Sequence, residues 1–181
     1  APYVHWGVMS VVLRVIIQLG IVALVFREPL ATCGWRWRGQ LAHLPRYAAL
    51  YLAMLPLLFW AATQPSFQQK YPFYRAAASD AGVFWGYELL YGAQFMGVEV
   101  FFRGFMTFAL FRRVGYNALF IMAIPYVMVH FNKPLPETFG ALGAALVLGL
   151  LALRAGSVVL GIFLHWAVGF TMDVLAIAKA L

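Results

Sequence analysis

The sequence predicts an all-α protein, a polytopic transmembrane helical bundle with about six spanning segments. Of its 181 residues, 64% are hydrophobic and only 10% are charged, and the mean hydropathy is +0.83. Many apolar runs approach the roughly 20 residues that a helix needs to cross a bilayer core. A soluble domain of this length has no core large enough to hide so much apolar surface. We therefore expect an integral membrane protein, and we place it in a prokaryotic plasma membrane.

The first predicted span covers residues 6–26. It ends at Glu28-Pro29, because proline removes a backbone donor and disfavours helix in the residue before it. Arg14 lies in the middle of this span, where a charge needs a partner, and we expect it to pair with a buried acid. The loop that follows alternates arginines with Trp35 and Trp37, which is typical of a chain at the headgroup interface.

The second span covers residues 47–64, and the polar, aromatic residues 65–80 predict a short element that lies on the surface. A third apolar run extends over residues 81–111. As a helix it is about 45 Å long, more than a bilayer core requires. It must tilt, protrude or break, and three glycines offer places to do so: Gly92, Gly97 and Gly104.

Three more apolar segments complete the predicted bundle. Residues 116–131 are interrupted by Pro125, residues 138–153 are rich in the small residues that let membrane helices pack closely, and residues 157–178 form the last span. The chain has no repeat and no low-complexity tract. We therefore predict one integral membrane domain over residues 1–181, with the residues capable of chemistry concentrated in residues 81–181.

The net charge of +7 reflects membrane topology. The basic residues lie mostly between the apolar runs, where they orient helices, so we expect membrane lipids as partners and no nucleic acid. Seven arginines fall in loops on one predicted side (Arg27, Arg36, Arg38, Arg46, Arg112, Arg113 and Arg154) and four basic residues on the other (Lys70, Arg75, Lys133 and Lys179). This balance predicts that both termini are outside.

Most of the polar side chains within apolar segments lie in the second half of the chain. The full set of these side chains is Arg14, Glu88, Glu99, Arg103, His130, His165 and Asp173. Glu99 and Arg103 are four residues apart and share a helix face. Because polar groups in hydrocarbon seek one another, we expect Glu99, His130 and His165 to meet although they come from different segments.

These residues follow the order of three motifs that resemble the CAAX protease and bacteriocin-processing enzyme (CPBP, or Abi) family. They are Glu99 with Arg103-Gly104-Phe105, then Tyr126 four residues before His130, then His165 in the last helix. The resemblance extends over about residues 86–173. It implies a glutamic-type intramembrane endopeptidase whose Glu and His side chains activate water to hydrolyse peptide bonds. Some relatives process prenylated proteins, so the implied substrate is a membrane-associated peptide or protein, prenylated or otherwise lipidated.

The chain departs from the family pattern at two positions. Val98 replaces the first of two adjacent glutamates, and Gly169 replaces the asparagine that usually stands four residues after the last His. Either Glu99 carries the chemistry, with Asp173 or Glu137 filling in, or this member has lost catalysis.

From these motifs we predict Glu99, His130 and His165 as catalytic residues, with Arg103, Asp173 and Glu137 in support. Glu99 is the expected base, since burial makes a carboxylate a better proton acceptor while Arg103 opposes this effect. His130 would orient the water and His165 would stabilise the oxyanion. We expect no cofactor and no metal, because the lone Cys33 and the histidines lack the spacing of a structural zinc site.

Three alternatives stay open at this stage. Glu99, His130, His165 and Asp173 would suit a metal-dependent membrane hydrolase if their helices converge. Val98 and Gly169 favour a catalytically inactive membrane scaffold or immunity protein that binds peptides or partner helices in the same cavity. A proton-coupled transporter would also bury such residues, but no inverted repeat is visible.

Overall fold

The computed structural model describes residues 2–180, and within them every regular element is helical. The α-helices are α1 (Pro2–Val11), α2 (Ile17–Gly20), α3 (Leu44–Ala61), α4 (Pro65–Lys70), α5 (Ala81–Glu99), α6 (Ala109–Val114), α7 (Asn117–Met128), α8 (Leu135–Ala155) and α9 (Val159–Ala180). Three π-helical segments join them: η1 (Val12–Ile16), η2 (Ile21–Val25) and η6 (Val100–Phe108). Short 3-10 turns form η3 (Leu30–Cys33), η4 (Gln40–His43) and η5 (Arg75–Ala78).

The described residues contain five helices long and apolar enough to cross a membrane, which confirms the polytopic all-α fold. They are Val4–Val25, Gln40–Ala61, Ala81–Val114, Leu135–Ala155 and Val159–Lys179. A sixth apolar helix, α7, has only 12 residues, although the sequence predicted a span over residues 116–131. Turns that begin at Val129 shorten it on one side.

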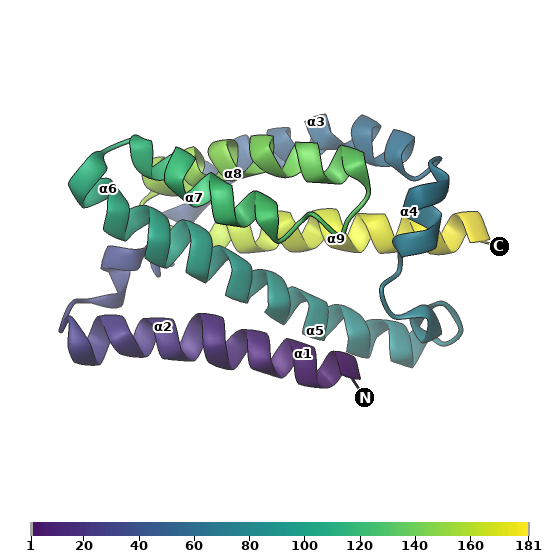
Figure 1. The fold of residues 1–181 in the computed structure, drawn as a ribbon, viewed down its shortest axis with the longest axis horizontal. Helices are drawn as coiled ribbons and strands as arrows, with labels where there is room; N and C mark the ends of the chain where they lie inside the picture. The colour runs from purple at the N-terminus through teal and green to yellow at the C-terminus, as the bar shows by residue number, and fades with distance from the viewer. Residues whose placement is uncertain (1, 181) are drawn as a thin grey trace.

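The helices run back and forth along the long axis of the molecule, so that both described ends of the chain lie at the same end of the bundle (Figure 1). The loops after α2, α6 and α8 gather at the opposite end. There Ser157 Oγ donates to the Arg36 carbonyl over 2.6 Å, and Arg112 forms a bidentate ion pair with Glu28 at 2.7 Å. The loops with the seven arginines thus share one end, as predicted; which side of a membrane this end faces stays a prediction.

The long third segment tilts across the bundle without breaking (Figure 1). It runs from α5 through η6 into α6, and within η6 the Thr107 hydroxyl donates to the Phe102 carbonyl over 2.8 Å. The glycines mark close contacts between helices. A Cβ atom at Gly97 would lie 2.5 Å from the Ser10 hydroxyl, and one at Gly92 would lie 2.9 Å from the Trp166 ring. Glycine therefore lets α1 and α9 approach α5.

The polar segment between α3 and α5 forms two short helices, α4 and η5, where one short surface element was expected, and it is not confined to the surface. Phe67 and Tyr71 are buried against residues of α3 and α9. The Tyr71 hydroxyl donates to Glu137 over 2.6 Å at the start of α8. This segment therefore covers the end of the bundle that holds the loop between α7 and α8.

Candidate active site

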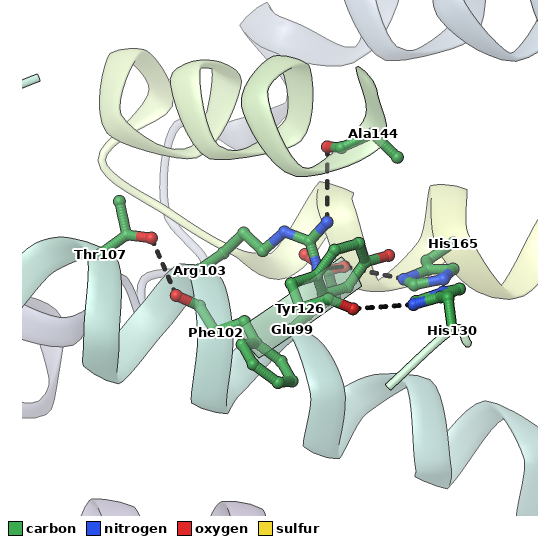
Figure 2. Close-up of polar contacts among 8 residues, drawn as sticks. All are labelled: Glu99, Phe102, Arg103, Thr107, Tyr126, His130, Ala144 and His165. Carbon is green, nitrogen blue, oxygen red and sulfur yellow. Dashed lines mark hydrogen bonds and ion pairs between the residues drawn. The ribbon is translucent and has the colours of Figure 1, made fainter. Parts of the chain in front are cut away.

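Glu99 and Arg103 lie where α5 passes into η6, and His165 faces them from α9 (Figure 2). The Oε1 atom of Glu99 lies 3.1 Å from Arg103 Nη1 and 2.8 Å from His165 Nδ1. Glu99 is 1% exposed and Arg103 is fully buried. Buried charges persist when they are paired and hydrogen-bonded, so this ion pair and its histidine form the polar centre of the bundle.

Arg103 connects this centre to two further helices. Its Nη2 donates to the Ala144 carbonyl of α8 over 3.4 Å. Its guanidinium carbon lies 3.8 Å from the centroid of the Tyr126 ring on α7, a cation–π contact that is stronger when shielded from water. Arg103 therefore contacts α7 and α8 as well as Glu99, and its supporting role in catalysis stays a prediction.

Both histidines lie near the ring of Tyr126 and next to one another (Figure 2). The ring centroids of Tyr126 and His130 are 4.7 Å apart, and those of Tyr126 and His165 are 6.4 Å apart. Nδ1 of His130 lies 2.8 Å from the Tyr126 carbonyl oxygen. A carbonyl can only accept, so Nδ1 donates and the neutral ring keeps its lone pair on Nε2. In the same way, the bond to the Glu99 carboxylate protonates Nδ1 of His165 and leaves its Nε2 to act as an acceptor.

The second oxygen of Glu99 lies against α9. Oε2 is buried and makes no hydrogen bond within residues 2–180. A Cβ atom at Gly161 would lie only 3.0 Å from this oxygen. Glycine at this position, one turn before His165, therefore lets the carboxylate approach the helix that carries its histidine partner.

The two departures from the family pattern lie in apolar surroundings. Val98 is buried in a cluster with Phe102, Met122 and Tyr126. A Cβ atom at Gly169 would lie 2.5 Å from the ring of Phe95, which packs on His165 with ring centroids 4.4 Å apart. No polar side chain can enter at position 169 without displacing Phe95.

Asp173 and Glu137 lie outside this centre. Asp173 interacts with Glu88 on α5, whereas Glu137 binds Tyr71 and Lys133. The structure thus brings Glu99, Arg103 and His165 into direct contact, with His130 next to His165 and in contact with the Tyr126 ring (Figure 2). The supporting roles of Asp173 and Glu137 stay predictions.

Arg14 does not have the acidic partner that we expected. It forms no ion pair with any described residue. Its Cβ would lie 3.3 Å from a Cβ atom at Gly97, so it packs along the face of α5, and the charged tip of such a side chain can extend toward the bilayer surface. The buried acids are engaged elsewhere: Glu99 with Arg103 and His165, and Glu88 with Trp166 and Asp173.

Several contributors to the site are invisible in the sequence. Tyr126 was noted only for its spacing to His130, and nothing indicated that its ring would face Arg103. The Ala144 carbonyl and the absent side chain of Gly161 carry no residue-type signal at all. Such contributions depend on how the helices pack, which spacing along one helix does not reveal.

The described side chains offer no group of three or more His, Cys, Asp or Glu placed to hold a metal ion. The convergence that a metal-dependent hydrolase requires is thus not formed by Glu99, His130, His165 and Asp173.

An apolar groove of about 220 Å³ lies between α5 and α9 next to this centre. Its lining includes Gly92 and Met96 on α5, Ile162 and Trp166 on α9, and Trp35 from the loop after η3. Trp166 directly follows His165 in the chain. The groove is therefore suited to hydrocarbon close to the polar centre.

The helical bundle, with five helices among the described residues long and apolar enough to cross a membrane, is that of an integral membrane protein. A model of the family described as Type II CAAX prenyl endopeptidase Rce1-like matches residues 80–171, slightly more than half of the chain, and the chain belongs to this family. The resemblance expected from the motifs is confirmed. The matched region contains Glu99, Arg103, His130 and His165 and ends before Asp173. Comparisons with curated proteins and with solved structures find no match.

Proposed function

We propose that this protein is an intramembrane endopeptidase that hydrolyses peptide bonds of membrane-associated or lipidated peptides. The observation that carries the proposal is the buried contact of 2.8 Å between Glu99 and His165. A carboxylate that accepts from one ring nitrogen increases the basicity of the other and stabilises the imidazolium that forms when a proton is taken up. The family to which the chain belongs supports the same class of reaction.

In the proposed mechanism, a water molecule lies between the Nε2 atoms of His165 and His130. His165 removes a proton from the water as its oxygen bonds to the substrate carbonyl carbon. The imidazolium then gives this proton to the departing amine nitrogen as the C–N bond breaks. His130 orients the water. Glu99 acts through His165, which differs from the direct base expected from the sequence, because its Oε1 is engaged by His165 and Arg103 and its Oε2 is buried against Gly161 of α9.

The substrate is proposed from the family and from the groove. An isoprenoid or acyl chain would occupy the apolar groove between α5 and α9, and the adjacent peptide would extend toward His165. The groove volume of about 220 Å³ fits part of such a chain. Transfer of hydrocarbon from water contributes about 0.8 kcal/mol per buried methylene, which would favour prenylated over unmodified peptides.

The test is cleavage of quenched peptides, with and without a prenyl group, by purified protein in liposomes. We expect His165→Ala and His130→Ala to abolish cleavage and Glu99→Gln to reduce kcat by a factor on the order of 10² to 10⁴. His5→Ala is the matched control, since His5 is exposed near the start of the chain. Activity that a chelator removes and a metal restores would contradict the mechanism.

Val98 and Gly169, which packs against Phe95, favour a second candidate, a catalytically inactive scaffold or immunity protein that binds peptides in the same place. If catalysis in this family requires the glutamate that Val98 replaces, folded wild-type protein will cleave no peptide and Val98→Glu will gain activity. Cleavage by the wild type that depends on His165 rejects this candidate.

A further inference from the structure

A second cluster of polar residues occupies the contact between α5 and α9, the two helices that carry Glu99 and His165 (Figure 1). Glu88 on α5 and Asp173 on α9 are both fully buried. They interact directly, carboxyl to carboxyl. The bundle therefore places two acidic groups together within its membrane-spanning part.

The hydrogen bonds around these acids are incomplete. The Trp166 indole N–H donates to Oε2 of Glu88 over 3.2 Å. Glu88 Oε1 and both oxygens of Asp173 are buried, and none of them has a hydrogen bond of normal geometry in the described part of the chain. Tyr87 adds a polar interaction with Asp173.

No cation balances the two acids. Among the described residues, neither Glu88 nor Asp173 takes part in an ion pair. Lys133 acts on Asp173 from a distance, but its Nζ lies 2.7 Å from Glu137. This pairing largely neutralises the lysine.

Two adjacent carboxylates without a cation are strongly unfavourable inside a membrane domain. Each charge loses its hydration, and the two charges repel one another. A single proton removes one of the charges and supplies the missing donor, because a protonated carboxyl can donate to its ionised neighbour.

We propose that Glu88 and Asp173 share one proton and form a proton-binding site in the membrane-spanning bundle, separate from the Glu99–His165 contact. The site does not depend on peptidase activity. The other titratable groups that interact with this site or with its tyrosines come from three elements: Tyr87 and Tyr91 on α5, Tyr71 and Tyr74 in the segment after α4, and Lys133 and Glu137 around the start of α8.

The shared proton helps to hold α9 against α5. Trp166 bonds Glu88, follows His165 in the chain, and packs against Gly92. Loss of the proton leaves two negative charges at this contact and drives the helices apart. The position of His165 is therefore sensitive to the charge of the acid pair.

Infrared spectroscopy of the purified protein tests the proposal through the carbonyl stretch of a protonated carboxylic acid. We expect this band in the wild type at neutral pH, and we expect it to be absent from the double variant Glu88→Gln, Asp173→Asn. Glu99→Gln is the matched control, since it removes another buried glutamate of α5 and should leave the band unchanged. Absence of the band from the wild type, or its loss in Glu99→Gln alone, overturns the proposal.

Isotope labelling provides the same test without mutation. Asp80 and Asp173 are the only aspartates of the chain, and Asp80 is exposed. Labelling aspartate or glutamate with ¹³C should shift the band in at least one of the two samples. If neither label shifts the band, no carboxyl side chain carries the proton.

Thermal unfolding in detergent between about pH 6 and about pH 10 supplies a second measurement. The wild-type Tm should fall as the pH rises, because the shared proton is lost. In Glu88→Gln the amide can donate to Asp173 at any pH, so this dependence should disappear. An equal dependence in both proteins contradicts the proposal, as does a sodium-dependent rise in Tm that is lost in Glu88→Gln, since this would assign the site to a metal cation.

Discussion

At the scale of single residues, Arg103 contacts three different partners while it is fully buried: the Glu99 carboxylate, the Tyr126 ring and the Ala144 carbonyl. Its replacement would leave Glu99 as a buried charge whose remaining polar partner is a histidine. Removing one partner of a buried ion pair is far more damaging than removing both.

We therefore expect Arg103→Ala to lower the free energy of unfolding by about 3–5 kcal/mol. The measurement is the unfolding midpoint in detergent. Arg113→Ala is the control, since Arg113 is exposed on the same continuous helix, and it should change stability by less than about 0.5 kcal/mol. The double variant Arg103→Met, Glu99→Gln should be more stable than Arg103→Ala, and equal stability would argue against an uncompensated charge.

Gly161 offers a more selective test of the active centre. In Gly161→Ala the new Cβ would lie 3.0 Å from Glu99 Oε2, so the carboxylate must move relative to His165. We expect kcat to fall by about 10-fold or more while the protein stays folded. Gly143→Ala is the matched control, because a Cβ there meets no atom within 4 Å. Unchanged activity in Gly161→Ala would contradict the role given to the Glu99–His165 contact.

At the scale of elements, an ion pair between Glu28 and Arg112 joins the end of the first helix to α6. Arg112 donates two hydrogen bonds of 2.7 Å to Glu28, and the hydrogen bond from Arg112 holds the pKa of Glu28 below its usual value. A carboxyl whose pKa is lowered by folding contributes stability above its unfolded pKa and loses it as the pH falls.

The stability difference between the wild type and Glu28→Gln should therefore be present at neutral pH and should close as the pH falls below about 4. It should also shrink with added salt, because the pair is exposed. The measurement is Tm against pH for both proteins. A difference that is constant across this range would show that the charge of Glu28 does not stabilise the contact.

Much of the helical fold, and one contact of the candidate site, could be predicted from the sequence. Hydropathy located most of the helices, and the spacing of Glu99 and Arg103 predicted their contact, because both depend on one helix alone. The contact with His165 could only be expected from the general tendency of polar groups to meet in hydrocarbon. Sequence alone predicts Gly92 and Gly97 as places for a helix to break, but they are sites of close packing, which depends on residues far away in the chain such as Ser10 and Trp166.

At the scale of the whole molecule, the arginine-rich loops lie at one end and both described chain ends lie at the other (Figure 1). The distribution of basic residues predicts that the arginine-rich end is cytoplasmic. That residues 1–181 form a single domain also stays a prediction.

Cysteine labelling tests this orientation. In a Cys33→Ser background, Arg38→Cys should resist a membrane-impermeant maleimide in intact cells, whereas Lys70→Cys should react. Opening the cells should make both positions reactive. The reverse pattern in intact cells would invert the predicted topology.

The shortness of α7 has a consequence for the surrounding lipid. Its 12 residues extend about 18 Å, compared with a hydrocarbon core of about 30 Å, and its outer face exposes Phe120, Ile124 and Met128. Such a hydrophobic mismatch is relieved when the adjacent bilayer becomes thinner. His130 lies two residues after the end of this helix. Water and the headgroups of a locally thinned leaflet would therefore come closest to the protein beside the proposed catalytic centre, and the acyl-chain length of the host membrane would regulate access to it.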